Sequence, residues 1–218
     1  MSSIQRSIYI KNPKEIAILR EAGRINAMAL AAVRAAIQPG VSTAELDAFA
    51  AEVIRKYGAK PAFLGVPGAY PYPATTTISI NDELVHGIPG KRRLKEGDIV
   101  SVDCGTIFEG FVGDSAFTTG VGEIAAEAQR LIDVTERSLA IGIEQLRAGN
   151  RVGDVGAAIQ AYVEGLDYHL TREYTGHGVG KAMWEGPQVP NYGIAGRGTP
   201  LRVGMTIALE PMVLVGTP

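Results

Sequence analysis

Residues 98–119 read DIVSVDCGTIFEGFVGDSAFTT and predict the central element of the fold. Residues 98–107 and 111–119 are rich in β-branched and aromatic side chains, which is typical of strands. Glu109 and Gly110 lie between them, and a two-residue connection with glycine predicts a tight hairpin turn. We therefore expect an antiparallel β-hairpin whose apolar residues belong to the core.

Two carboxylates lie inside this hairpin. If Glu109 and Gly110 form the turn, Asp103 faces residue 116 across the ladder, and Asp114 lies on the same face. The two residues are then diagonal neighbours, about 7–8 Å apart at the backbone, and both can reach a shared cation. A simpler interpretation needs no cation: Asp114 would be an exposed strand residue and Asp103 a turn residue. However, a lone charge among apolar neighbours costs much free energy, so we expect the carboxylates to have a partner.

Helices and further strands are predicted on both sides of the hairpin. Asn12-Pro13-Lys14-Glu15 is typical of a helix start, and Pro39-Gly40 ends that helical pattern. A second helix follows Ser42, which Glu45 can close as a capping box. The buried stripe of this second helix is predicted to be Leu46, Phe49, Val53 and Tyr57. Further along the chain we expect a strand at 75–80, helices near 123–147 and 152–166, a glycine-rich loop at 176–198 and a strand near 205–215.

The pattern of turns occurs twice along the chain. Ile37-Gln-Pro-Gly40 recurs as Leu146-Arg-Ala-Gly149, and Leu94-x-x-Gly97 before Asp103 recurs as Leu201-x-x-Gly204 before Glu210. Because the two pairs have almost the same offset, they predict two pseudo-symmetric halves of class α+β, with antiparallel strands and outer helices. We interpret residues 1–218 as a single domain, with an N-terminal half at about 12–120 and a C-terminal half at about 121–218.

Composition excludes several classes of protein. Lys and Arg number 21 against 23 Asp and Glu, so the net charge of −2 gives no reason to expect a nucleic-acid or anionic-membrane partner. The lone cysteine, Cys104, excludes an intrachain disulfide, and we interpret it as a packing residue rather than a nucleophile. The first residues, MSSIQR, lack an apolar signal core, and no later stretch is long enough to span a bilayer. We therefore expect a cytoplasmic protein.

Two further candidate ligands lie in the C-terminal half. His177 lies in the glycine-rich stretch TGHGVG at 175–180, and Glu210 lies in the apolar stretch IALEPM at 207–212. With Asp103 and Asp114 they form a set of three carboxylates and one imidazole, which suits Mn, Fe, Co or Zn rather than a thiolate zinc site. Three anionic ligands repel one another unless more than about two positive charges offset them, which points to two cations.

Five motifs occur in order along almost the whole chain: NDELVHGIP at 81–89, Asp103 with Gly113-Asp114-Ser115, TGHGVG at 175–180, PQVPNY at 187–192 and LEPM at 209–212. In sequence and spacing they resemble the type I methionine aminopeptidases. The resemblance implies the pita-bread fold, in agreement with the internal repeat. It also implies two divalent metal ions, Co, Mn, Fe or Zn, held by Asp103, Asp114, His177 and Glu210.

The same resemblance implies the reaction and the substrate. A metalloaminopeptidase of this family removes the initiator methionine from nascent peptides by metal-activated attack of water on the first peptide bond. His86 matches the histidine that contacts the substrate near that bond, and Glu210 is the candidate general base. Phe63, Tyr70 and Tyr72 fall in the loop that forms the methionine side-chain pocket. We expect the protein to act as a monomer.

The chain departs from the family at two places. The family has a second histidine seven residues after the metal-binding one, where it contacts the substrate amide and the tetrahedral intermediate, but this chain has Trp184. Tryptophan offers only an indole N–H donor, so we expect a loss of about 10²-fold in rate. The family also continues past the position of Pro218 to a glutamate that bridges the metals. The sequence therefore predicts a chain truncated at its C-terminus, or a naturally incomplete relative.

These departures leave other functions open. A catalytically impaired or non-catalytic pita-bread relative would act as a peptide-binding module. A Xaa-Pro peptidase, or a metal-free creatinase-like hydrolase, would have the same fold, usually with an additional N-terminal domain. The early start of the first helix, at Asn12, and the presence of all four candidate ligands favour the methionine aminopeptidase.

Overall fold

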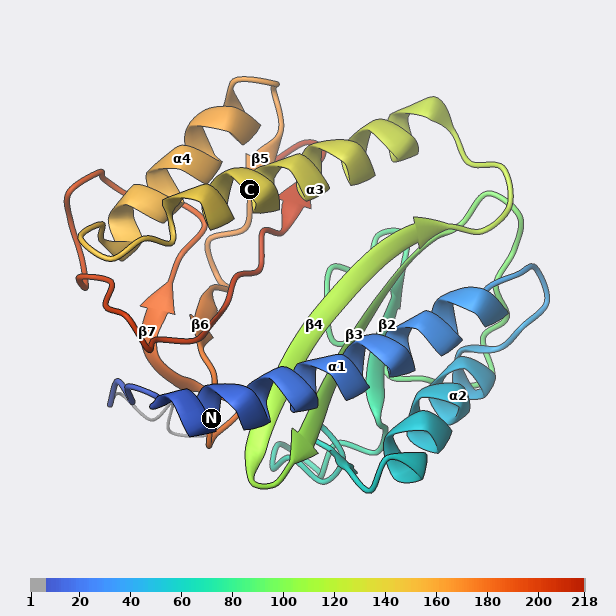
Figure 1. Cartoon of the computed structure of the whole chain (residues 1–218). Helices are drawn as coiled ribbons and strands as arrows, with labels where there is room; N and C mark the ends of the chain where they lie inside the picture. Colours follow the sequence, from blue (N-terminus) through green and yellow to red (C-terminus); the bar gives the residue numbers. More distant parts are fainter. Residues whose placement is uncertain (1–6, 218) are drawn as a thin grey trace. The chain divides into compact units, whose positions relative to one another are not determined.

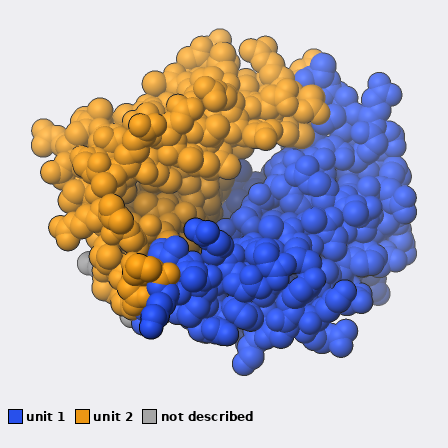
Figure 2. All heavy atoms as spheres, viewed as in Figure 1, with its two compact units in different colours: residues 1–3, 14–126, 180–183 blue, residues 4–13, 127–179, 184–218 orange. Residues whose placement is uncertain are grey.

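The computed structural model describes residues 7–217 and divides the chain into two compact units (Figures 1 and 2). Unit 1 contains residues 14–126 and 180–183. Among the described residues, unit 2 contains 7–13, 127–179 and 184–217. Residues 1–6, on which the predicted lack of a signal segment rests, and Pro218 lie outside the described residues.

Unit 1 is built on an antiparallel sheet with a long central strand. Strand β3 (Ile99–Phe108) pairs with β4 (Phe111–Gly120) along its whole length, and also with β2 (Thr76–Ile80) and the short β1 (Lys60–Pro61). Glu109 and Gly110 connect β3 to β4 with φ angles of 46° and 80°, and Phe108 faces Phe111 across the turn. The predicted hairpin and its turn are therefore confirmed.

Two helices, α1 (Pro13–Ala36) and α2 (Thr43–Lys56), cover one face of this sheet (Figure 1). Ser42 and Glu45 form the predicted capping box at the start of α2. The predicted buried stripe of α2 was wrong for Phe49, which is 42% exposed. Leu46, Ala50 and Ile54, spaced by four residues, face the core instead, because that spacing keeps side chains on one face of a helix.

Unit 2 has its own helices and its own core. Helices α3 (Ala126–Gln145) and α4 (Val152–Glu164) pack with two small antiparallel sheets. One sheet pairs β5 (His169–Leu170) with β9 (Val213–Leu214). In the other, β6 (Gly176–Gly178) lies between β7 (Glu185–Val189) and β8 (Ile207–Ala208). Among the helices of the described residues, none is long and apolar enough to cross a bilayer.

Two predictions for unit 2 were wrong. The stretch 176–198 is not a loop throughout, since it contains β6 and β7. A Cβ atom on Gly178 would overlap the Gly186 carbonyl, so this glycine permits close strand pairing rather than irregular backbone. The strand expected near 205–215 is divided into β8 and β9, and Glu210 lies between them, because Pro211 has no N–H for a sheet ladder.

Each unit contains the same pair of glycine turns joined by a backbone hydrogen bond, as the internal repeat predicts. The four repeated glycines all have a positive φ angle: Gly40 (91°), Gly97 (85°), Gly149 (102°) and Gly204 (90°). The amide of Leu94 donates to the carbonyl of Val41 at 2.8 Å, and the amide of Leu201 donates to the carbonyl of Asn150 at the same distance. Equivalent residues thus adopt equivalent backbone conformations in two separate cores.

A buried ion pair attaches the N-terminal segment to β7 inside unit 2. Lys11 Nζ lies 2.6 Å from Glu185 Oε2, and the two side chains are 1% and 4% exposed. The amide of Gly186 also donates to the carbonyl of Ser7 at 3.2 Å. Because a buried charge without its partner is very unfavourable, this pair fixes residues 7–11 against the strand that follows Trp184.

Candidate metal centre

The two aspartates of the hairpin lie on one face of the sheet in unit 1. Asp103 pairs with Ala116 and Asp114 pairs with Gly105, so the two carboxylates are diagonal neighbours, as predicted from the turn. Both side chains are half-buried. Their face is opposite to the one that packs against α1 and α2, to which Cys104 belongs. The alternation along β3 therefore separates the polar face of this sheet from its core.

A ring from the 63–73 loop packs on the same face as the aspartates. A Cβ on Gly105 would lie 3.0 Å from the Phe63 ring, so Phe63 packs directly on the glycine opposite Asp114. Phe63 is buried, at 7% exposure. The Phe63 ring, which the family resemblance implies for a methionine pocket, thus packs beside the two carboxylates within unit 1.

The other predicted pocket residues differ in their surroundings. Tyr70 is 59% exposed, whereas Tyr72 is half-buried and its hydroxyl lies 3.0 Å from the Thr76 carbonyl and 3.2 Å from the Gly87 carbonyl. Burial, followed by the charges of Asp47 and Asp103, raises the pKa of Tyr72, so its hydroxyl stays protonated and donates. Tyr72 therefore holds the loop that carries His86.

His86 lies in a constrained turn beside β2. Its φ angle is 62°, which is uncommon for a residue other than glycine, and its side chain is exposed. The next residue, Gly87, donates to the Ser79 hydroxyl at 3.1 Å, and its carbonyl accepts from the Ile78 amide at 2.8 Å. Since a strained backbone persists only where its surroundings hold it, these contacts give His86 a defined place next to the sheet.

His177 lies in β6, and its hydrogen bond determines its tautomer. Nδ1 lies 2.8 Å from the carbonyl oxygen of Gly178. Because a carbonyl oxygen only accepts, we assign the proton to Nδ1, which leaves a lone pair on Nε2 in the neutral imidazole. Metal-binding histidines use the same arrangement, in which the second nitrogen donates to an oxygen that fixes the ring.

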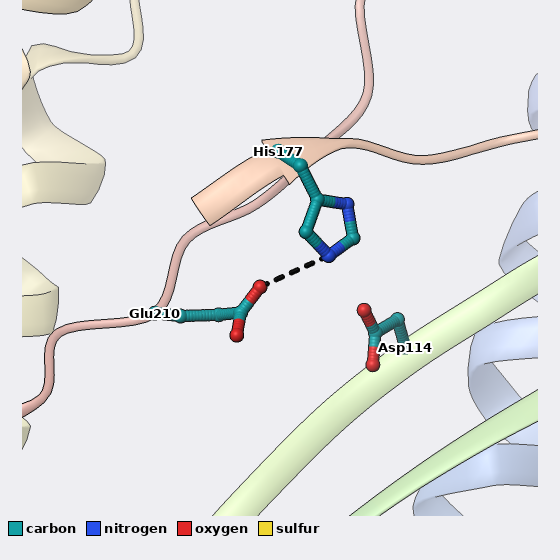
Figure 3. Close-up of side chains that lie close together, drawn as sticks. All are labelled: Asp114, His177 and Glu210. Carbon is teal, nitrogen blue, oxygen red and sulfur yellow. Dashed lines mark ion pairs between the residues drawn. The ribbon is translucent and has the colours of Figure 1, made fainter. Parts of the chain in front are cut away.

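The Nε2 nitrogen of this ring faces a carboxylate in the same unit. Nε2 of His177 lies 3.1 Å from Oε1 of Glu210 (Figure 3). That oxygen is buried and, among the described residues, has no hydrogen-bond partner. A lone pair facing a carboxylate oxygen is repulsive unless a cation, either a proton or a metal ion, lies with them. The pair therefore fits a bound cation, and it joins residues 33 positions apart in the sequence.

Glu210 is held by its backbone and not by a strand. It lies between β8 and β9, and the amide of Asn191 donates from Nδ2 to the Glu210 carbonyl oxygen at 2.6 Å. Asn191 is fully buried, so this contact fixes the main chain at Glu210. Sequence analysis missed Asn191, although an asparagine within the motif PQVPNY was a visible signal.

Trp184 directly precedes β7 in unit 2 and is half-buried. Its neighbour Glu185 pairs with Gly178, the residue after His177, and is fixed by the ion pair to Lys11. The register of the pairing between β6 and β7 shifts between His177 and Gly178. The residue at position 184 is thus firmly placed beside the strand that carries the imidazole.

The thiol of Cys104 is expected to be unreactive in the folded protein. Burial raises the pKa of the thiol, the Asp103 charge raises it further, and the side chain is 0% exposed. Because the thiolate is the reactive species, Ellman's reagent should modify no thiol in native protein and one thiol per chain in guanidinium chloride. Fast modification of the native protein would contradict the packing role of Cys104.

Comparisons with known proteins agree on one family. The model of metallopeptidase family M24 matches residues 17–217. A methionine aminopeptidase from Clostridium acetobutylicum is 51% identical over 211 residues, covering 96% of this chain and 83% of the relative. Methionine aminopeptidase 1 from Bacillus subtilis is 46% identical over 210 residues, covering 96% and 84%. The crystal structure of methionine aminopeptidase from Thermotoga maritima superposes with a TM-score of 0.92 at 44% identity, covering 95% and 82%.

The chain belongs to metallopeptidase family M24. The three relatives named above are methionine aminopeptidases, so the predicted family resemblance, the pita-bread fold and the metalloaminopeptidase function are confirmed. Membership in a metallopeptidase family also means that the chain binds divalent metal. The pair of His177 and Glu210 supplies an imidazole and a carboxylate of the kind that such an ion requires.

Proposed function

We propose that this protein removes the N-terminal methionine from newly made peptides by metal-assisted hydrolysis of the first peptide bond. The observation that carries the proposal is the contact of His177 Nε2 with the buried Oε1 of Glu210 at 3.1 Å, which calls for a cation. The family and the relatives named above support the choice of a metal ion and of a methionine substrate.

We further propose that Asp103 and Asp114 join His177 and Glu210 as ligands of two divalent ions, Co, Mn, Fe or Zn. The support is the composition of the donor set. Oxygen donors with a single imidazole suit these metals, and three carboxylates need more positive charge than one divalent ion supplies. Such ions act as Lewis acids, which polarise the scissile carbonyl and make water a stronger nucleophile.

The residues of the chain then have distinct roles in the reaction. Glu210 accepts the proton of the attacking water through its second carboxylate oxygen, since Oε1 faces Nε2 of His177. The exposed imidazole of His86 contacts the substrate near its first peptide bond and thereby positions it. Trp184 lies against the substrate, where its indole N–H is a weaker replacement for a protonated imidazole.

Phe63, Tyr70 and Tyr72 are proposed to shape the site for the methionine side chain. The buried ring of Phe63 on Gly105 offers an apolar wall next to the aspartates. Tyr72 acts through its hydroxyl by holding the loop of His86, and the exposed ring of Tyr70 has room to cover a bound substrate. We also propose that the protein works as a monomer, since one chain carries every proposed ligand, and in the cytoplasm, where nascent chains are made.

The proposal is tested with purified protein and the peptide Met-Ala-Ser in the presence of Mn²⁺ or Co²⁺. We expect release of free methionine, detected by amino-acid chromatography, and its loss on addition of a chelator. N-acetylated Met-Ala-Ser is the matched control, because an aminopeptidase requires a free amine and should leave it intact.

The peptide-binding alternative predicts a different result. A non-catalytic relative would bind Met-Ala-Ser, measurable by calorimetry, without releasing methionine under any divalent metal. Complete absence of free methionine with all four metals would therefore refute the proposed activity.

A further inference from the structure

We propose that Asn26, in helix α1, is a positioning residue that fixes the Asp103 and Asp114 carboxylates of the metal site. The inference rests on the proposed function, since it concerns the two ligands that unit 1 is proposed to supply. It is carried by a hydrogen-bond network behind the face on which these aspartates lie.

The amide of Asn26 uses both of its hydrogens and its oxygen. Nδ2 lies 2.7 Å from the carbonyl oxygen of Cys104 and 2.7 Å from Oγ of Ser115. Oδ1 accepts from the hydroxyl of Thr106, also at 2.7 Å. Because a backbone carbonyl only accepts, Nδ2 must face Cys104, and the orientation of the amide is determined. The Asn26 side chain is 0% exposed, so water does not reach its amide, and among its partners Thr106 is also 0% exposed whereas Ser115 is exposed.

The two bonds from Nδ2 span β3 and β4 at one position of the ladder. Cys104 pairs with Ser115, directly between the pair of Asp103 with Ala116 and the pair of Gly105 with Asp114. Each proposed ligand is therefore the immediate chain neighbour of a residue that Asn26 holds. A shift of β3 relative to β4 at the pair of Cys104 with Ser115 would change the distance between the Asp103 and Asp114 carboxylates.

The same helix contacts β4 on the other side of Asp114. A Cβ on Gly113 would lie 2.7 Å from the backbone nitrogen of Gly23 and 2.7 Å from the carbonyl carbon of Ala22. Ala22 and Asn26 are one helical turn apart and face the same way. Helix α1 thus contacts both neighbours of Asp114, Gly113 by backbone packing and Ser115 by a directed hydrogen bond.

Burying an asparagine at this position costs free energy, which its hydrogen bonds must offset. The surrounding stripe of α1 is apolar, and a buried amide loses its hydration without adding hydrophobic burial. A fully satisfied polar network, in return, restricts its partners to one arrangement. Metal ligands need this restriction, since loss of the groups that orient them typically weakens metal affinity by about 10–100-fold.

The test is a titration of the full chain with Co²⁺, followed by calorimetry and by the visible absorption of the bound ion. We expect Asn26→Leu, which keeps the volume but removes the hydrogen bonds, to weaken Co²⁺ binding by at least about 10-fold and to change the spectrum. Ser115→Ala removes one bond and should have a smaller effect in the same direction. Val33→Ala is the matched control, because it destabilises the same helix from a fully buried position without touching the network.

The outcomes separate this inference from the proposed function. If the wild-type protein binds no Co²⁺, the proposed function fails and the inference fails with it. If the wild type binds Co²⁺ and Asn26→Leu has the same affinity and spectrum, only the role of Asn26 is overturned. Should Asn26→Leu not fold, Ser115→Ala and Thr106→Val decide, and wild-type binding in both would overturn the inference.

Discussion

Replacement of His177 by alanine is expected to abolish stoichiometric metal binding and methionine release together. The imidazole is the only nitrogen donor in the proposed ligand set, and its Nε2 faces Glu210 at 3.1 Å. A bound metal supplies several kcal/mol of transition-state stabilisation, so the loss in kcat/KM should be about 10³-fold or more. Elemental analysis after dialysis and the Met-Ala-Ser assay measure the two effects.

Matched variants make this result specific. His169→Ala removes another histidine, on β5, and should leave the metal content unchanged. Asp103→Ala tests the aspartate half of the site in the same way, with Asp133→Ala, at an exposed carboxylate on α3, as its control. Undiminished metal in both His177→Ala and Asp103→Ala would refute the proposed site.

Trp184→His is expected to raise kcat by about 10²-fold, because an imidazole restores a hydrogen bond made in the transition state. KM should change little, since the gained interaction belongs to the transition state rather than to the bound substrate. The backbone at this position is firmly held, as Glu185 is fixed by Lys11, so the new side chain starts from a defined place.

The control for this variant is Trp184→Phe. Phenylalanine keeps an aromatic ring but has no N–H, so kcat should stay at or below that of the wild type. Steady-state kinetics on Met-Ala-Ser with a fixed metal distinguishes the variants. An unchanged kcat in Trp184→His would show that tryptophan at this position does not limit the reaction.

Local patterns were sufficient to predict much of unit 1. The hairpin turn at Glu109 and Gly110, the register that places Asp103 and Asp114 on one face, and the Ser42 capping box all follow from short-range rules. The exposure of Phe49 could not be predicted from such rules, because several faces of α2 are apolar and only the packed core decides which one is buried.

Unit 2 was harder to predict for a physical reason. Its strands are two to five residues long, so their sequences carry little periodic signal, and β5 and β8 pair with strands about 30 or more residues away. The contact of His177 with Glu210 and the burial of Asn191 also depend on tertiary packing and not on local sequence. Asn26 was visible in the sequence as a polar residue next to Ile25 in an apolar stripe, but its three partners were not.

The path of the chain between the two units has a consequence for dissecting the protein. Residues 7–13 belong to unit 2, 14–126 to unit 1, 127–179 to unit 2, 180–183 to unit 1 and 184–217 to unit 2. No single cleavage of the backbone can separate such interleaved segments. A fragment that ends near residue 126 would lack residues 180–183 of its own unit, including Gly180, whose carbonyl accepts the amide of Val112 at 2.8 Å.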